Sequence, residues 1–283
     1  MNNRLLHTPE GVRDIYGKEY AKKLAIEQKL QQAIHCFGYE DIQTPSIEFF
    51  DVFSKEIGTT PSKELYKFFD REGNTLVLRP DFTPSVSRAC ATYFNPEKEV
   101  VSLCYTGNTF INNSSFRGRL KETTQMGVER MGDDSPEADA EILAMTVECL
   151  LTAGLTEFQV SVGQVDYYKA IFAQTGMSQE EEEELRELIS QKNYFGVEEL
   201  VKSKKMDKSL AKVLSQLPQM FGSAEVLEKA KALTDNPQAL KAVARLEEIY
   251  ELLKVYGYEK YITFDFAMLS KYHYYTGIIF QAY

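Results

Sequence analysis

The sequence changes character between residues 178 and 254, and this change constrains the fold more than any other feature. Aromatic and β-branched residues become scarce there, while Leu, Ala, Lys and Glu become common. Two apolar stripes recur at helical spacing, as expected for the core of a small helical subdomain. They are Leu210, Val213, Leu214 and Leu217, and then Leu240, Val243, Leu246 and Ile249 or Tyr250. The stretch therefore predicts a helical insert, which begins with an acidic first turn at residues 180–184.

The sequence on either side of this insert contains short strand candidates. They lie at residues 65–69, 75–78, 100–106, 158–163, 261–266 and 278–283. Few of them alternate with helices in the regular way that marks a parallel, doubly wound sheet. We therefore expect an α+β fold, in which an antiparallel sheet is flanked by helices.

Two helices outside the insert are indicated by spacing and by their ends. Residues 18–37 carry Ile26, Leu30, Ala33, Ile34 and Phe37 at helical spacing, and Gly38 ends the pattern. A second helix is expected from Ser135 and Pro136 to about Thr152, because a serine cap followed by proline favours a helix start.

The composition narrows the class of protein. A chain of 283 residues with 43% hydrophobic content is long enough to bury a core. No stretch approaches the roughly 20 apolar residues of a membrane span, and no apolar signal segment opens the chain, so a cytoplasmic location is expected. The net charge of -10 argues against broad affinity for nucleic acids, which depends on clustered lysine and arginine.

Cysteine and histidine spacing predicts no metal site. The residues concerned are Cys36, Cys90, Cys104 and Cys149, and His7, His35 and His273. None of the cysteines forms a C-x-x-C pair, and the histidines do not form a recognisable zinc ligand set. We expect reduced thiols in or near the core and no cofactor.

Several ordered segments resemble one enzyme family. They are residues 8–14 (TPEGVRD), 78–83 (LRPDFT), 107–111 (GNTFI), 125–129 (QMGVE) and 270–277 (SKYHYYTG). Together they resemble the core of histidyl-tRNA synthetases, which are class II aminoacyl-tRNA synthetases. Residues 81–84 (DFTP) and 274–280 (YYTGIIF) are closer to their paralogues, the regulatory subunits of ATP phosphoribosyltransferase. The resemblance implies a synthetase-like core over residues 1–175 and 257–283, with the helical insert at 176–256 and an end before the family's motif 3.

The resemblance also implies a pocket for histidine. It places Asp81, Thr83, Gln125 and Glu129 around the α-amino group, and Tyr274 and Tyr275 against the imidazole. Asp81 stands where many synthetases have the longer glutamate. Taken singly, these residues have simpler interpretations, which stay open: Asp81 as a helix cap, Glu129 as an ion-pair partner of Arg130 or Arg119, and the tyrosines as core.

Two expected contacts for ATP are missing. Where the synthetases have arginines that bind the α-phosphate, this sequence has Ile111 and Ser270. An isoleucine side chain cannot neutralise a phosphate, so little or no amino-acid activation is expected. Arg79, Arg117, Arg119 and Lys121 lie nearby in sequence and leave weak nucleotide affinity open. His273 replaces the aspartate that precedes the tyrosine pair.

The expected function is that of a non-catalytic regulatory subunit. The resemblance implies a short-form ATP phosphoribosyltransferase catalytic subunit as partner, a hetero-octamer, and feedback by histidine on the first step of histidine biosynthesis, without tRNA binding. Residues 40–48 resemble the motif that forms the homodimer in this family; the pattern alone also fits an edge strand that ends at a proline. The alternatives are a histidyl-tRNA synthetase core that activates histidine, and an amino-acid-binding paralogue with another partner.

Overall fold

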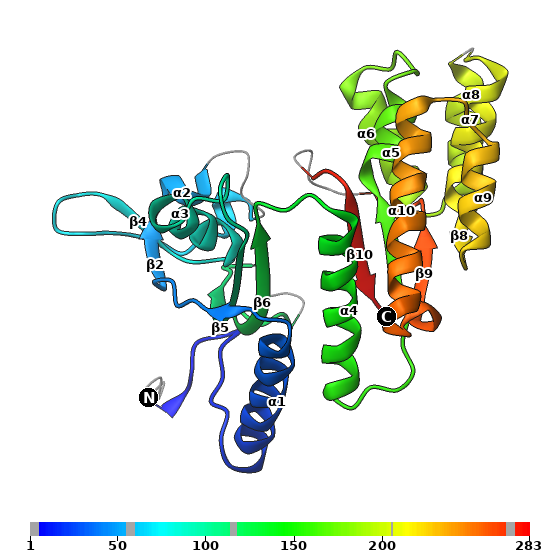
Figure 1. Ribbon diagram of the computed structural model, residues 1–283. Helices are drawn as coiled ribbons and strands as arrows, with labels where there is room; N and C mark the ends of the chain where they lie inside the picture. Colours follow the sequence, from blue (N-terminus) through cyan, green and yellow to red (C-terminus); the bar gives the residue numbers. More distant parts are fainter. Residues whose placement is uncertain (1–5, 55–59, 114–117, 205, 270–274) are drawn as a thin grey trace. The chain divides into compact units, whose positions relative to one another are not determined.

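The computed structural model describes residues 6–54, 60–113, 118–204, 206–269 and 275–283 (Figure 1). The chain divides into two compact units, residues 1–133 and residues 134–283, which are named unit 1 and unit 2. The predicted boundaries of the insert, 176 and 256, stay a prediction.

Unit 1 contains two small sheets and three α-helices among its described residues. Its elements are α1 (Gly17–Cys36), β1 (Glu40–Asp41), β2 (Ile47–Phe49), α2 (Asp51–Ser54), the 3-10 turn η2 (Ser62–Glu64), β3 (Lys67–Phe69), β4 (Thr75–Leu78), α3 (Thr83–Tyr93), β5 (Val101–Phe110) and β6 (Glu122–Met131). One sheet has the order β1-β5-β6 and the other β2-β4-β3. The strand predicted at 40–48 is thus two strands, one in each sheet.

The long hairpin of β5 and β6 organises unit 1. The two strands pair antiparallel over ten residues, from Val101 opposite Met131 to Phe110 opposite Glu122. The helix α3 packs on one face of this hairpin through a cluster of Val86, Cys90, Val101 and Leu103. Because side chains alternate between the two faces of a strand, Leu103, Tyr105 and Gly107 all lie on the face that α3 covers or approaches.

The helix α1 confirms the helix predicted at residues 18–37, but most of its apolar stripe is not core. Only Ala33 and Ile34 are buried, whereas Ile26 is 43% exposed. Figure 1 shows why: the helix extends away from the strands of unit 1, so only its C-terminal end is close to them. Gly38, with φ of 83°, follows the helix in a left-handed conformation that glycine adopts readily.

Unit 2 contains one mixed sheet with helices around it. Its elements are α4 (Pro136–Thr152), β7 (Val160–Gln164), α5 (Val165–Phe172), α6 (Gln179–Ser190), α7 (Tyr194–Ser203), α8 (Lys208–Gln216), η4 (Leu217–Gln219), β8 (Phe221–Gly222), α9 (Glu225–Ala232), α10 (Pro237–Tyr256), η5 (Glu259–Tyr261), β9 (Ile262–Asp265) and β10 (Ile278–Ala282). The strand order is β10-β7-β9-β8.

The helices of unit 2 bury the apolar stripes predicted for the insert. Val213, Leu214 and Leu217 are buried from one stripe, and Val243, Leu246 and Ile249 from the other. The long helix α10 packs against α4 and α5, and an ion pair of 2.8 Å joins Arg245 of α10 to Asp139 of α4. The predicted helix start at Ser135 is confirmed, because the Ser135 side chain accepts a hydrogen bond from the Ala138 backbone amide.

The α+β class is confirmed, with two departures from an all-antiparallel sheet. Strand β1 pairs with β5, and β7 pairs with β9, in parallel. The sequence analysis also missed β6, whose pattern of Thr, Gln and Glu with few apolar residues conceals a strand paired along its whole length. These are pairings between distant segments, which a local pattern does not reveal.

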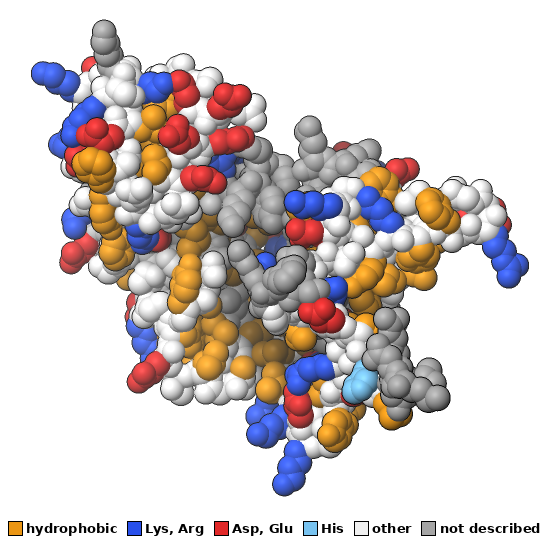
Figure 2. Space-filling view, turned by 180° about the vertical axis from the view of Figure 1, so that it is seen from behind, with side chains coloured by type: hydrophobic (Ala, Val, Ile, Leu, Met, Phe, Trp, Pro, Cys, Tyr) orange, Lys and Arg blue, Asp and Glu red, His pale blue; other side chains and the backbone are white. Residues whose placement is uncertain are grey.

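The next features concern the surface charge, the hydropathy of the helices and the cysteines. On the face seen in Figure 2, Lys and Arg side chains are interspersed with Asp and Glu. Among the described residues, no helix is both long and apolar enough to cross a bilayer. The four cysteines form no disulfide; Cys90 and Cys104 are buried and Cys149 is half-buried, but Cys36 is exposed, contrary to the expectation of core thiols.

Candidate functional site

Asp81, Thr83 and Glu129 form a small acidic cluster at the start of α3. The Thr83 hydroxyl donates a hydrogen bond of 2.6 Å to Glu129 Oε1, and this bond links α3 to β6. The Thr83 backbone amide lies 3.3 Å from Asp81 Oδ1. Asp81 is not the cap residue of α3, which is Phe82, but its side chain accepts this contact from the first helical residue and stands beside a second carboxylate.

The register of the hairpin explains why Gln125 belongs to the same face. Glu129 lies opposite Leu103, Gly127 opposite Tyr105, and Gln125 opposite Gly107. Side chains two residues apart on a strand point to the same face, so Gln125 and Glu129 share the face that carries Thr83. Gln125 is exposed, whereas Glu129 is half-buried. Four of the six predicted histidine contacts therefore lie along one face of unit 1.

An aromatic pair forms the floor of this face. The rings of Phe82 and Tyr105 are stacked, with centroids 4.2 Å apart and planes 10° apart. Gly127 leaves room for the tyrosine, since a Cβ atom there would lie 2.4 Å from the Tyr105 hydroxyl oxygen. The sequence analysis did not single out Phe82, Tyr105 or Gly127, although all three fall within or beside the segments that carry the resemblance.

The electrostatics of the cluster favour a positively charged ligand. Burial raises the pKa of Glu129, the negative charge of Asp81 raises it further, and the hydrogen bond from Thr83 opposes both effects. Burial also raises the pKa of Tyr105, and the charges of Glu129 and Asp81 add to the rise. A cation such as an ammonium group would favour the ionised forms of these two neighbouring carboxylates.

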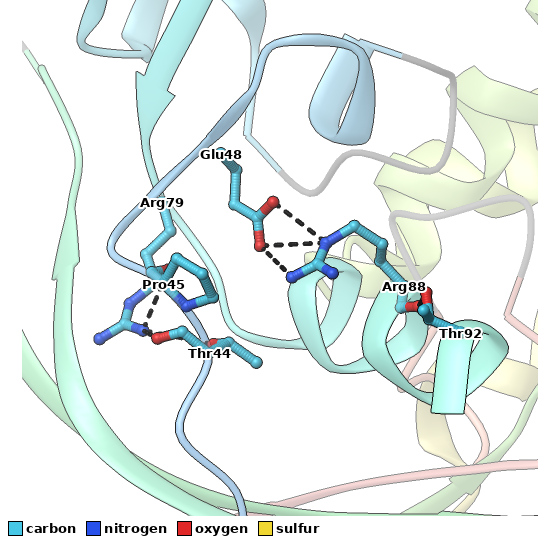
Figure 3. A network of polar contacts seen from close by, with 6 residues as sticks. All are labelled: Thr44, Pro45, Glu48, Arg79, Arg88 and Thr92. Carbon is cyan, nitrogen blue, oxygen red and sulfur yellow. Dashed lines mark hydrogen bonds and ion pairs between the residues drawn. The ribbon is translucent and has the colours of Figure 1, made fainter. Parts of the chain in front are cut away.

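Arg79 is a structural residue rather than a phosphate ligand. Its side chain is directed toward Thr44 and Pro45 (Figure 3) and donates a hydrogen bond of 2.8 Å to the Thr44 carbonyl oxygen. It also donates to the Asn108 carbonyl oxygen at 2.9 Å, and its guanidinium carbon lies 3.8 Å from the centroid of the Phe82 ring. Only 5% of the residue is exposed. These contacts remove Arg79 from the cations left open for nucleotide binding.

Glu48 and Arg88 continue this polar network. The Arg88 guanidinium donates to both carboxylate oxygens of Glu48, with a shortest distance of 2.7 Å (Figure 3). Glu48 is buried, and its charge partly opposes the lowering of the Arg79 pKa that burial causes. The network joins residues 44–48 to α3, and it fixes the first residues of α3 beside the acidic cluster.

The predicted tyrosine pair belongs to unit 2. The Tyr275 carbonyl oxygen accepts a hydrogen bond of 2.6 Å from Lys169 of α5. The next residues, Thr276 and Gly277, line a polar cavity of about 700 Å³ within unit 2. Tyr274, Ser270 and His273 lie outside the described residues.

Several known proteins are similar to this chain. A sequence model of the histidyl-tRNA synthetase family matches residues 11–283. A curated protein from Clostridium acetobutylicum, called ATP phosphoribosyltransferase regulatory subunit, is 38% identical over 100% of this chain and 70% of its own length. A protein of the same description from Acetivibrio thermocellus is 37% identical over 98% of this chain and 66% of its own length.

A solved structure agrees with these relatives. It is described as an ATP phosphoribosyltransferase regulatory subunit/histidyl-tRNA synthetase from Bacillus halodurans, and it matches with a TM-score of 0.89 at 31% identity. The match covers 99% of this chain and 73% of that one. The chain belongs to the ATP phosphoribosyltransferase regulatory subunit family. It spans about two thirds of the length of the curated relatives described above.

One position at which this chain is expected to differ from the synthetases is visible in the structure. Ile111 follows β5, where the resemblance places an arginine in the synthetases, and its backbone amide donates to the Lys121 carbonyl oxygen at 2.9 Å. Its half-buried side chain is apolar and supplies no charge to this end of the hairpin. This end of the hairpin is therefore apolar at position 111, whereas Asp81, Thr83 and Glu129 form an acidic cluster elsewhere in unit 1.

The raised pKa of Glu129 predicts a pH dependence of stability. The carboxyl pKa is higher in the folded protein than its ordinary value of 4.5, so the folded state binds more protons between these two values. This contribution to stability is fully present below the unfolded pKa and is lost as the pH rises through the folded pKa. Urea unfolding of Glu129→Gln, followed by circular dichroism from pH 4 to pH 8, is expected to lack this loss.

The control for this prediction is Glu97→Gln, which changes an exposed glutamate of unit 1. It is expected to follow the parent protein across the same pH range. A parent and a Glu129→Gln variant with parallel pH profiles would contradict the assignment of Glu129 as a carboxyl that is costly to ionise.

Proposed function

We propose that this chain is a non-catalytic regulatory subunit of an ATP phosphoribosyltransferase, required for the first step of histidine biosynthesis and for its feedback control by histidine. The observation that carries the proposal is a contrast within unit 1. Asp81, Thr83 and Glu129 form an acidic cluster suited to an amino group, while Ile111 occupies a position where activation of an amino acid calls for arginine.

The proposed ligand of the site is histidine. Its ammonium group fits the acidic cluster, because a positive charge there would favour the ionised forms of two neighbouring carboxylates. Tyr105 and Phe82 provide an apolar floor beside that cluster. The full proposed set of histidine contacts is Asp81, Thr83, Gln125, Glu129, Tyr274 and Tyr275.

The proposed absence of catalysis follows from charge. Formation of an adenylate develops negative charge on the α-phosphate, and loss of a single positioned contact of this kind typically costs about 2.7 to 4 kcal/mol of transition-state stabilisation. Ile111 supplies no such contact, and Arg79 is committed to backbone carbonyl oxygens. Ser270, the second departure, lies outside the described residues.

The proposed role requires two protein partners. They are a short-form catalytic subunit, with which the chain forms a hetero-octamer, and a second copy of the chain, which it meets through residues 40–48. We also propose that the protein acts in the cytoplasm and does not bind tRNA. Histidine then biases two arrangements of the complex by binding them with unequal affinity.

The decisive experiment measures phosphoribosyl-ATP formation by the short catalytic subunit of the same organism. The assay is run with and without the full gene product that contains this sequence, across a titration of histidine. Activity that requires the added protein and falls with histidine is the expected result. Lack of both activation and co-elution with the catalytic subunit would contradict the proposal.

Variants separate histidine sensing from assembly. Thr83→Val and Glu129→Gln are expected to raise the histidine concentration for half inhibition at least about tenfold, the effect of losing about 1.4 kcal/mol of binding. Activation without histidine is expected to persist. Thr124→Val changes an exposed residue on the opposite face of β6 and serves as the matched control.

A second candidate function is that of a histidyl-tRNA synthetase core. The family model that matches the chain and the Bacillus halodurans structure both carry that enzyme's description. ATP–pyrophosphate exchange that depends on histidine distinguishes the two. A robust exchange rate would favour the synthetase and reject the non-catalytic role.

A further inference from the structure

Three side chains with metal-binding atoms converge on unit 1, away from the acidic cluster. They are His35 in the last turn of α1, Asp41 of β1 and Cys104 of β5. His35 Nε2 lies 3.1 Å from Asp41 Oδ2, and Cys104 Sγ lies 3.3 Å from Asp41 Oδ1. The ligand atoms of all three residues lie within 4.8 Å of one another.

The fold itself produces this convergence. The parallel pairing of β1 with β5 places Asp41 opposite Cys104, and the Ile42 amide donates to the Cys104 carbonyl oxygen at 2.8 Å. The left-handed turn at Gly38 then returns the chain from α1 to β1, which brings His35 back over Asp41. Spacing alone predicts no metal site, because Cys104 is 63 residues from Asp41 in sequence.

We propose that His35, Asp41 and Cys104 bind a zinc ion, with His35 Nε2, one Asp41 oxygen and the Cys104 thiolate as ligands. Imidazole nitrogen, carboxylate oxygen and thiolate sulfur are all zinc ligands, whereas a thiolate is foreign to magnesium and calcium sites. Three protein ligands leave the fourth tetrahedral position open for water or another small ligand.

The spacing of the donor atoms fits this ion. Zinc bonds of about 2.0 to 2.3 Å in a tetrahedron place neighbouring ligand atoms roughly 3.3 to 3.8 Å apart. His35 Nε2 and Cys104 Sγ lie 3.1 and 3.3 Å from different oxygens of Asp41, and the ligand atoms of all three residues lie within 4.8 Å of one another, so shifts of about 1 Å bring them to that range. The ion exchanges for the thiol proton of Cys104, which leaves to solvent as the sulfur–zinc bond forms.

An outer contact holds the central carboxylate. Gln31 lies one helical turn before His35 on α1, and its Nε2 donates a hydrogen bond of 2.9 Å to Asp41 Oδ1. Groups that orient metal ligands in this way typically change affinity 10- to 100-fold when removed. The Asp41 and His35 side chains are 56% and 41% exposed, so an ion reaches them from solvent, while the Cys104 sulfur closes the site from inside.

The site adds a second attachment to the end of α1 that is already packed. Ala33 and Ile34 are its buried residues, both near its C-terminal end. An ion bound by His35, Asp41 and Cys104 ties that end to β1 and β5. Binding is therefore expected to slow hydrogen exchange in residues 30–42 more than elsewhere in the chain.

The test uses the full chain, titrated with cobalt(II) as a spectroscopic probe and with zinc(II) in competition. One equivalent of cobalt is expected to give a thiolate-to-cobalt charge-transfer band and tetrahedral ligand-field bands, which zinc abolishes. Cys104→Ser is expected to lose the charge-transfer band. His35→Gln and Asp41→Asn are expected to weaken binding at least tenfold, and Gln31→Met about tenfold.

Two control variants make the outcome decisive. Cys149→Ser, in α4 of unit 2, and Cys36→Ser, next to His35, both retain the band if the site is as proposed. Absence of a thiolate band in the parent protein, or its loss in Cys36→Ser with retention in Cys104→Ser, would overturn the proposal. His35→Gln and Asp41→Asn change exposed side chains, so the test does not depend on the folding of the buried Cys104→Ser variant.

Discussion

Replacing Arg79 with methionine is expected to lower the free energy of unfolding of unit 1 by roughly 2 to 6 kcal/mol, since two buried or half-buried acceptors each cost about 1 to 3 kcal/mol when left without a donor. The acceptors are the carbonyl oxygens of Thr44 and Asn108, at 2.8 and 2.9 Å from the guanidinium nitrogens. Methionine fills much of the same space but donates no hydrogen bond. Urea unfolding followed by circular dichroism measures the loss.

Arg79→Met is also expected to loosen the packing beside the acidic cluster. Its guanidinium lies over Phe82, which precedes Thr83 and stacks on Tyr105. Gly107 provides the space for this packing, because a Cβ atom there would lie 2.6 Å from Arg79 Nη2. Hydrogen exchange in residues 40–50 and 80–86 is therefore expected to accelerate in Arg79→Met.

Arg119→Met is the matched control, because Arg119 is an exposed arginine of the same unit. Its unfolding free energy is expected to stay within about 0.5 kcal/mol of the parent value. Equal stability of Arg79→Met and Arg119→Met would show that the Arg79 contacts do not hold residues 44–46 against β5.

Gly127→Ala is expected to abolish the proposed binding of histidine and to destabilise unit 1 by about 1 to 3 kcal/mol, the usual cost of overpacking. The added methyl group would lie 2.4 Å from the Tyr105 hydroxyl oxygen and 2.5 Å from its ring carbon Cζ. The Tyr105 ring cannot move toward α3 without disturbing its stacking on Phe82. Isothermal titration with histidine and urea unfolding measure the two effects.

A second substitution tests whether the clash with Tyr105 is the cause. Gly127→Ala combined with Tyr105→Leu removes the ring atoms that the methyl group would meet, so most of the lost stability is expected to return. Histidine binding is expected to remain weak, because the aromatic floor is gone. Equal destabilisation in the single and double variants would mean that Gly127 is needed for a reason other than the space occupied by Tyr105.

Local patterns predicted much of the secondary structure. The cap at Ser135, the strand at residues 75–78 and the apolar stripes of α8 and α10 follow from short-range rules of spacing and capping, and each is present. The helix predicted at residues 18–37 is also present, but of its predicted apolar residues only Ala33 and Ile34 are buried. Periodicity shows that a helix has an apolar face, but it does not show how much of that face another element covers.

The candidate site was predictable only through resemblance. Singly, Thr83 and Glu129 have no local feature that marks a ligand contact. Their hydrogen bond, and the raised pKa of Glu129, exist because α3 begins beside β6. Tyr105 was missed because a tyrosine in a strand is ordinarily core, and its role depends on the glycine opposite it on β6.

The sequence by itself determined the α+β class, the helical character of residues 178–254, the acidic residues of the site and the apolar residue at position 111. Only the tertiary structure decided that Arg79 is buried in backbone contacts, that β1 pairs in parallel with β5, and that His35, Asp41 and Cys104 meet. The physical reason is the distance along the sequence over which each kind of interaction acts. Helix and turn preferences act over a few residues, whereas burial, charge pairing and ligand sets arise from side chains that the fold brings together from distant segments.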